Sequence, residues 1–213
     1  MKCGINGAEH DFNEIPCGIN GAVRQASELW IGVNGAVKKV WPLIEAGYQE
    51  ILDTVGSGEW TCPASGQWEV EGHGGGCGGE HGSRSMGGAG GGGSGDVFTI
   101  TLTAGQEVEY QVASGGRGAP AVGHGRPSSG GDTTFDELTF YGASSRSAEG
   151  SLASAGEPGT SSAAGSGGEG NKNKPEQIYG NGGSGGRRIY SGTGSYSAGS
   201  DGKDGAIILT YLG

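Results

Sequence analysis

Basic residues are scarce in this chain, and long apolar runs are missing. Only 13 Lys and Arg stand against 23 Asp and Glu, which gives a formal net charge of −10. Apart from Lys38-Lys39 and Arg187-Arg188 the basic residues are scattered, so the chain lacks the basic face that binds a phosphate backbone. We expect no nucleic-acid partner. No apolar run is long enough to cross a bilayer, and the N-terminus lacks the basic-then-apolar pattern of a signal peptide. We therefore expect synthesis in a cytoplasm, without membrane insertion or export by the general secretory route.

Proline is also scarce, with 7 residues among 213, whereas glycine contributes 51. Glycine is therefore several times more frequent than its usual share of roughly 7%, and by composition alone this favours low complexity or disorder. A collagen triple helix is excluded, because the three-residue glycine step of Gly72, Gly75 and Gly78 breaks at His81.

The four cysteines do not form a recognisable disulfide framework. Cys3 and Cys17 occupy the same position in two copies of a repeat whose third copy has Ile31, so they are interpreted as small apolar residues. A bond between Cys62 and Cys77 is possible by count, but a cytoplasmic origin argues against it.

The first 42 residues contain one phrase three times. G-[IV]-N-G-A begins at Gly4, Gly18 and Gly32, fourteen residues apart. Asn-Gly between β-forming residues is a strong hairpin signal, because both residues accept the positive φ of a type I′ turn. The sequence predicts three β-hairpins that join as a small meander, each packed on its neighbour.

Two interpretations of these repeats are open. They are either a self-contained β-module or a docking module that a larger assembly, or copies of the chain, holds in order. A module of about forty residues buries little surface, which favours docking. The docking residues expected are Asn6, Asn20, Asn34, Trp30 and Trp41. Residues 43–58 are interpreted as a linker to a domain at 59–213.

Strand patterns separated by glycine tracts fill residues 59–213. Trp68 and Val70 alternate with polar residues, including Glu71, and residues 97–112 show two alternating segments joined by Ala104-Gly105. A short pair is expected around Phe135 and Phe140. The last strand, 205–213, is apolar on both faces and suits a central position. About seven short strands favour an all-β fold with a jelly-roll-like β-sandwich.

The glycine tracts allow two structures. They are flexible linkers, or they are extended helices of three residues per turn that bond to one another through their backbones. Only glycine lets neighbouring backbones approach so closely. We favour the second structure for residues 72–80, 87–95 and 180–186. Residues 151–177, rich in serine and glycine, are expected to form an exposed, mobile loop.

Several motifs in order resemble a known family. They are W-x-x-P-x-x-G-x-W at residues 60–68, "LTAGQ" at 102–106 and D-G-x-x-G-x-I-I at 201–208. Together they resemble the glycine-rich domain of bacteriophage and prophage tail-fibre proteins, a jelly roll with polyglycine helices. The opening repeats resemble N-terminal segments of prophage tail proteins from Gram-positive bacteria. The chain departs from the family pattern around 144–177, so no contact residue is transferred there.

The resemblance implies a structural virion protein of a phage tail fibre or tail tip. Its N-terminus would dock on other tail or baseplate proteins, and its glycine-rich domain would recognise a polysaccharide or protein of the host surface. Such proteins are usually homotrimers. Two alternatives remain: a purely structural tail-tip, baseplate or decoration protein, and a cellular adhesin, which the missing export signal disfavours.

No enzyme constellation is found in the sequence. No carboxylate pair, nucleophile elbow or phosphate loop stands in its required context. We expect neither catalysis nor a cofactor. His73, Cys77 and His81 are metal-binding residue types at a spacing of four, but in a helix of three residues per turn they would diverge. We expect no metal there.

Binding residues are sought among aromatic and basic side chains on glycine-supported loops. For each tyrosine, simple packing is the alternative role. The receptor-binding candidates are Tyr141, Tyr179, Tyr190, Tyr196, Arg187, Arg188 and His124.

Overall fold

The structure is a computed structural model that divides into two compact units, Met1–Ile44 and Glu45–Gly213. In the first unit it describes the backbone of the strands. In both units together the described residues are 2–5, 8–11, 16–19, 22–25, 29–33, 36–41, 44–82, 90–121, 126–144, 150–156, 165–174, 176–186 and 197–213.

The first unit consists of three antiparallel hairpins, which confirms the hairpin prediction. The paired strands are β1 (Lys2–Ile5) with β2 (Ala8–Asp11), β3 (Pro16–Ile19) with β4 (Ala22–Gln25), and β5 (Leu29–Val33) with β6 (Ala36–Trp41). Among the described residues each hairpin forms its own two-stranded sheet, so the predicted single meander is wrong. Most of these strands have four residues and offer few backbone pairs to a neighbour. The turn residues Asn6, Asn20 and Asn34 lie outside the described residues, and Trp30 and Trp41 lie in β5 and β6.

The second unit contains two four-stranded antiparallel sheets. One has the strand order β10-β9-β14-β7 and the other the order β13-β12-β11-β8. Their bounds are β7 Gln49–Leu52, β8 Gly56–Thr61, β9 Gly66–His73, β10 Gly95–Leu102, β11 Glu107–Val112, β12 Thr133–Phe135, β13 Leu138–Phe140 and β14 Ala206–Tyr211. Thus β7 and the start of β8 lie in the segment interpreted as a linker. β7 contributes ladder bonds to β14 and belongs to the sandwich.

Apolar side chains between the two sheets form the core. Trp68 and Val70 are fully buried, as the alternation in β9 predicts, and Trp60 packs edge-on against Trp68 at 5.2 Å between ring centroids. β14 lies between β9 and β7, which confirms the central position expected for the last strand. The buried members of this core are Trp60, Cys62, Trp68, Val70, Leu102, Val108, Val112, Phe135, Phe140, Ile207 and Leu209. Within the described part of the chain, no helix has the length and apolarity needed to span a membrane.

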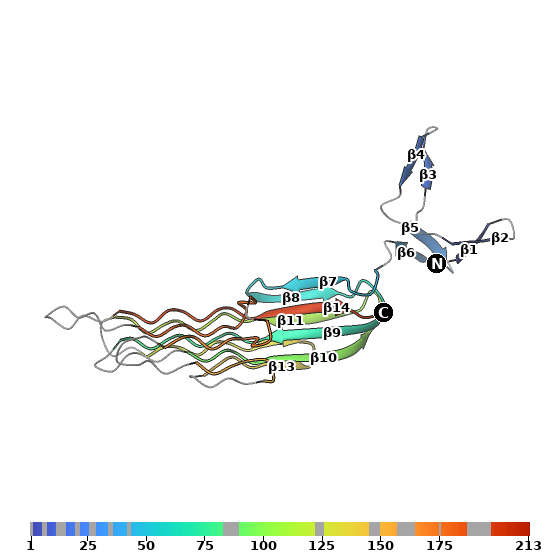
Figure 1. Cartoon of the computed structure of the whole chain (residues 1–213). Helices are drawn as coiled ribbons and strands as arrows, with labels where there is room; N and C mark the ends of the chain where they lie inside the picture. Colours follow the sequence, from blue (N-terminus) through green and yellow to red (C-terminus); the bar gives the residue numbers. More distant parts are fainter. Residues whose placement is uncertain are drawn as a thin grey trace. The chain divides into compact units, whose positions relative to one another are not determined.

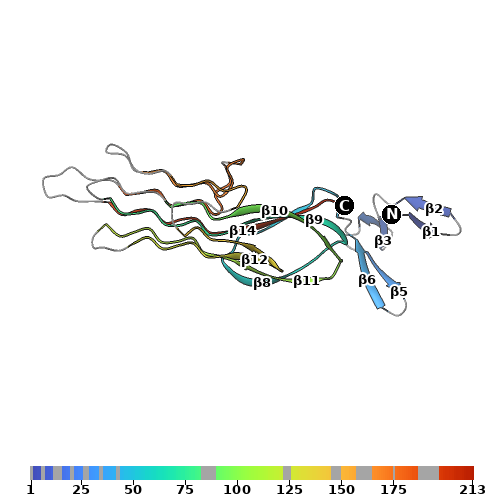
Figure 2. The same cartoon turned by 90° about the horizontal axis from the view of Figure 1, so that it is seen from below.

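Glycine-rich tracts leave one end of this sandwich and run side by side away from it (Figures 1 and 2). Most tracts adjoin a strand, as residues 74–82 continue β9 and residues 90–94 lead into β10. In the described part of the chain, tracts 150–156, 165–171 and 180–186 adjoin no strand and lie between β13 and β14 in the sequence. The described tracts are 74–82, 90–94, 113–121, 126–132, 141–144, 150–156, 165–171, 180–186 and 197–205.

The tract 74–82 shows how the lattice is built. The N–H groups of residues 74 and 77 donate to tract 90–94, those of 75 and 78 to tract 126–132, and those of 76 and 79 to tract 197–205, at 2.9 to 3.1 Å. Its carbonyl groups accept from three further tracts, at 113–121, 141–144 and 180–186. The repeat of three is that of a polyproline II helix. This tract is therefore hydrogen-bonded to six neighbours.

Glycine is required where these backbones meet. A Cβ on Gly76 would lie on the carbonyl oxygen of Asn181, and one on Gly79 would lie on that of Ser184. Backbone, unlike a flexible side chain, cannot move aside. Of the two structures considered for the tracts, the bonded lattice is therefore the one observed.

The described parts of the serine- and glycine-rich segment 151–177, at 151–156, 165–174 and 176–177, do not form the exposed loop that the sequence predicts. Ala153, Gly168 and Asn171 are buried. Gly168 donates its N–H to Gly90 and accepts at its carbonyl from Gly182. The segment supplies two further tracts of the lattice, because its glycines recur at the positions where neighbouring backbones meet.

Candidate functional site

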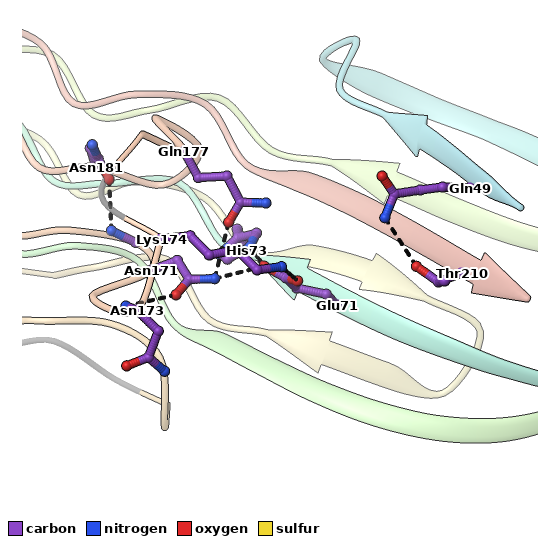
Figure 3. A network of polar contacts seen from close by, with 10 residues as sticks. Gln49, Glu71, His73, Asn171, Asn173, Lys174, Gln177, Asn181 and Thr210 are labelled. Carbon is purple, nitrogen blue, oxygen red and sulfur yellow. Dashed lines mark hydrogen bonds and ion pairs between the residues drawn. The ribbon is translucent and has the colours of Figure 1, made fainter. Parts of the chain in front are cut away.

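A buried polar network joins the sandwich to the lattice (Figure 3). Glu71 lies on the face of β9 that points away from the core, between Ile208 of β14 and Val97 of β10. The alternation in β9 correctly assigns it to that face. Nevertheless Glu71 is only 4% exposed, because the segment 171–177 covers it.

Every described partner of the Glu71 carboxylate donates to it. His73 Nε2 and Asn171 Nδ2 lie 3.0 and 2.8 Å from Oε1, and Lys174 Nζ lies 2.7 Å from Oε2. Asn171 is itself held by the side chain of Gln177 and by the backbone N–H of Asn173. Four residues of this segment thus hold the carboxylate of Glu71 directly or through one another. We call them the clasp: Asn171, Asn173, Lys174 and Gln177.

The clasp keeps Glu71 ionised. Burial alone would raise the pKa of Glu71, but hydrogen bonds from His73, Lys174 and Asn171 outweigh it and hold the pKa at about 2. A carboxyl group with so low a pKa is not a proton donor at neutral pH. The arrangement therefore suits attachment of one chain segment to another, and not acid–base catalysis.

Tyr179 extends this network toward β7. Its ring stacks on that of His73 with 6.4 Å between centroids, and its hydroxyl donates to Asp53 Oδ2 at 3.1 Å. Burial, followed by the hydrogen bond to Asp53 and then by the charge of Asp53, raises the pKa of Tyr179. This receptor-binding candidate is therefore partly buried and bonded within its own domain.

The weak metal candidate does not come together. His73 Nε2 is bonded to Glu71, while Cys77 lies in the lattice with its Sγ 3.3 Å from the carbonyl of Ser128. Among the described residues no group of three or more His, Cys, Asp or Glu side chains could hold a metal ion. Cys62 and Cys77 are free and buried, so the disulfide that was possible by count is not present.

A second feature is an open polar groove of about 560 Å³ across β8, β11 and β12. Cross-strand pairing places Glu59 opposite Glu109, and Gln111 between Ser57 and Thr134. The lining residues are Ser57, Gly58, Glu59, Glu109, Tyr110, Gln111, Thr134 and Asp136. Glu59, Glu109 and Asp136 contribute carboxyl groups to this lining, and the neighbouring Glu107 raises the pKa of Glu59.

Of the remaining predicted binding residues, the structure describes Tyr141. Tyr141 follows β13 and is 54% exposed. His124, Arg187, Arg188, Tyr190 and Tyr196 lie outside the described residues. The sequence analysis missed Asn171 and Lys174, because their partner is about a hundred residues away and no local pattern links them.

A family comparison is consistent with this architecture. A family model described as "Glycine-rich domain" matches residues 53–207, which is most of the chain. The chain belongs to this glycine-rich domain family. The matched range holds every described tract and begins after the hairpin unit, which stays outside it. None of the curated proteins compared with the chain matches it significantly. The glycine-rich domain is thus the part of the molecule that carries both the clasp and the groove.

Proposed function

We propose that the protein is a structural component of a phage tail that recognises the host cell surface through its glycine-rich domain. The observation that carries the proposal is the lattice itself. It extends the domain in one direction from the sandwich and fixes the ends of many tracts together (Figure 1). A rigid support lowers the entropic cost of binding by the loops attached to it.

The positions of the candidate residues support this. Arg187, Arg188, Tyr190 and Tyr196 belong to the connection 187–196, between tracts 180–186 and 197–205. The described ends of that connection are anchored, because Gly186 donates to the carbonyl of Glu80 and Ser197 accepts from Gly82. The connection 122–125, which holds His124, also joins two tracts.

The hairpin unit supplies the proposed docking end. Isolated two-stranded hairpins are marginally stable in water. Three of them without a shared sheet gain order by binding to another tail protein. The unit lies outside the family match, as expected of an attachment region that varies with its partner.

The test is binding of the purified full chain to intact host cells and to their cell-wall polysaccharide. Arg187→Ser with Arg188→Ser should reduce binding by about tenfold or more if these residues are anchors. The control is Arg117→Ser with Arg146→Ser, which removes the same charge elsewhere. No binding by the parent chain would contradict recognition, and equal loss in both variants would contradict the role of Arg187 and Arg188 as anchors.

A purely structural role in the tail tip is the second candidate, favoured by the density of backbone bonds in the lattice. Deleting whole tracts cannot separate the two roles, since it would remove lattice neighbours. Replacing 187–196 with a Gly/Ser segment of equal length keeps them. Particles that assemble but do not adsorb indicate recognition, and particles that adsorb normally indicate scaffolding.

A further inference from the structure

Among the four edge strands of the sandwich, β10 differs from the other three in length and composition. β7 has four residues and carries Glu50, β13 has three residues, and β8 contains two glycines and Glu59. Short length, charge and glycine each discourage the pairing of an end strand with another chain. β10 has eight residues, and from Val97 to Leu102 it contains no charge, proline or glycine.

The free edge of β10 is covered at its first two residues. Leu152 donates its backbone N–H to the carbonyl of Gly95, and Ser151 donates to the side chain of Asp96. Beyond that point, in the part of the chain that the structure describes, β9 is the strand that pairs with β10. A six-residue apolar and threonine segment therefore has one backbone edge without a partner strand.

The core is also incomplete at this edge. Phe98 pairs with the buried Val70 and contacts Phe140 at 6.0 Å between centroids, so its ring points between the two sheets. Even so it is 41% exposed, because among the described residues β10 is the last strand of its sheet. An aromatic side chain of this size gains free energy when a neighbouring strand covers it.

We propose that β10 pairs with β10 of a second copy of this chain, in antiparallel register about a two-fold axis at Ile100. Phe98 then lies across from Leu102 of the other copy, and Ile100 across from its equivalent. On the opposite face Thr99 lies across from Thr101.

In this register, side chains of the same kind lie opposite one another. Apolar side chains face apolar ones between the sheets, and threonines face threonines outside, which are favourable cross-strand pairs. The chain carries a net charge of −10, so most surfaces of two copies repel each other. The segment 97–102 carries no charge, and this edge can meet its equivalent without that repulsion.

The test is the mass of the full-length protein in solution, by sedimentation equilibrium, for three chains. Thr99→Lys places a charge on the β10 edge. Thr61→Lys places the same charge on an exposed threonine of another end strand, β8. The parent chain and Thr61→Lys should be dimers, whereas Thr99→Lys should have its dissociation constant raised by about tenfold or more.

A second variant checks the register directly. Cysteines at Thr99 and Thr101 together should form an oxidised cross-link between two copies, because these positions lie opposite each other. Thr61→Cys should not cross-link under the same conditions, and peptide mass spectrometry identifies the bonded residues.

Three results would overturn the proposal. One is a parent chain that sediments as a monomer, whether or not Thr99→Lys changes its stability. Another is a three-fold particle unaffected by Thr99→Lys. The third is equal dissociation in both lysine variants, which would reflect charge alone.

Discussion

The sandwich and the lattice are stabilised in different ways. In the sandwich, Trp68, Phe135 and Leu209 bury large side chains between two sheets, and backbone bonds follow from strand pairing. In the lattice, tract 74–82 is glycine at six of its nine positions, and its backbone bonds to six neighbours hold it in place. Apolar burial stabilises the first region, and saturation of peptide groups stabilises the second.

This difference changes how the two regions tolerate substitution. A core side chain can change rotamer or be replaced by another of similar volume. A lattice glycine has no such freedom where a carbonyl oxygen of the next tract occupies the place of its Cβ. Single substitutions should therefore destabilise the lattice more than the sandwich, even though the lattice buries less apolar surface.

The largest effect is expected for Gly76→Ala. Its new Cβ meets the Asn181 carbonyl, so a whole tract must shift, and we expect a loss of about 3 kcal/mol or more in the free energy of unfolding. Gly131→Ala is the matched control, because its Cβ would lie 3.1 Å from the Cβ of Ala113, a contact that small shifts relieve. Urea unfolding of both variants gives the measurement, and equal losses would contradict this sensitivity of the lattice to substitution.

The sequence predicts much of the sandwich and only part of the lattice. Alternation in β11 and the apolar β14 are local patterns, and both strands lie where those patterns place them. The tracts next to strands were also recognisable. Segment 151–177 was wrongly predicted because its partners, such as Gly90 and Gly182, are defined by spatial packing alone. A glycine repeat looks the same in a linker and in a lattice.

The clasp could not be predicted from the sequence, for a related reason. The pattern in β9 places Glu71 on the outer face, where glutamate is normally solvated. Its burial depends on Asn171 and Lys174, in a segment that had been interpreted as an exposed loop. The groove across β8 and β11 likewise required the pairing of Glu59 with Glu109, which no local pattern specifies.

The clasp predicts a specific acid sensitivity at the junction of the two regions. The pKa of Glu71 is about 2 in the folded chain. With about 4.3 for an unfolded glutamate, the shift corresponds to about 3 kcal/mol at neutral pH. Because the folded pKa is lowered, this stability is present above about pH 4.3 and is lost as the pH falls toward 2.

Denaturant unfolding of the parent chain and Glu71→Gln as a function of pH measures this contribution. The parent should be more stable at pH 7, and the two curves should converge below about pH 2, where Glu71 becomes mostly protonated in the folded chain. Glu69→Gln, two residues along the same strand, is the control and should show a smaller gap. If the difference in the free energy of unfolding between the parent and Glu71→Gln does not depend on pH, the clasp is excluded as its cause.

Native thiols report on each region separately. Cys62 lies in the sandwich core and Cys77 in the lattice, and burial raises the pKa of both thiols, which slows their reaction with thiol reagents. Ordering glycine costs about 1 kcal/mol or more per residue, close to the net gain of one backbone bond. The lattice should therefore open at a lower urea concentration than the sandwich. In moderate urea, Cys77 should then be labelled about tenfold faster than Cys62. Equal rates, measured by peptide mass spectrometry, would mean that the regions open together.

The smallest effect concerns the outer face of the sandwich, where Glu107 raises the pKa of Glu59. A carboxyl group with a raised folded pKa lowers stability as it ionises, so stability falls as pH rises above about 4.3, opposite in sign to Glu71. Glu107→Gln removes the repulsion and should slightly raise the melting temperature at neutral pH and low salt. In about 1 M salt, where the screening length is about 3 Å, the gain should vanish because both side chains are exposed. A gain that persists in salt would require a packing change at this face, since screened charges could not produce it.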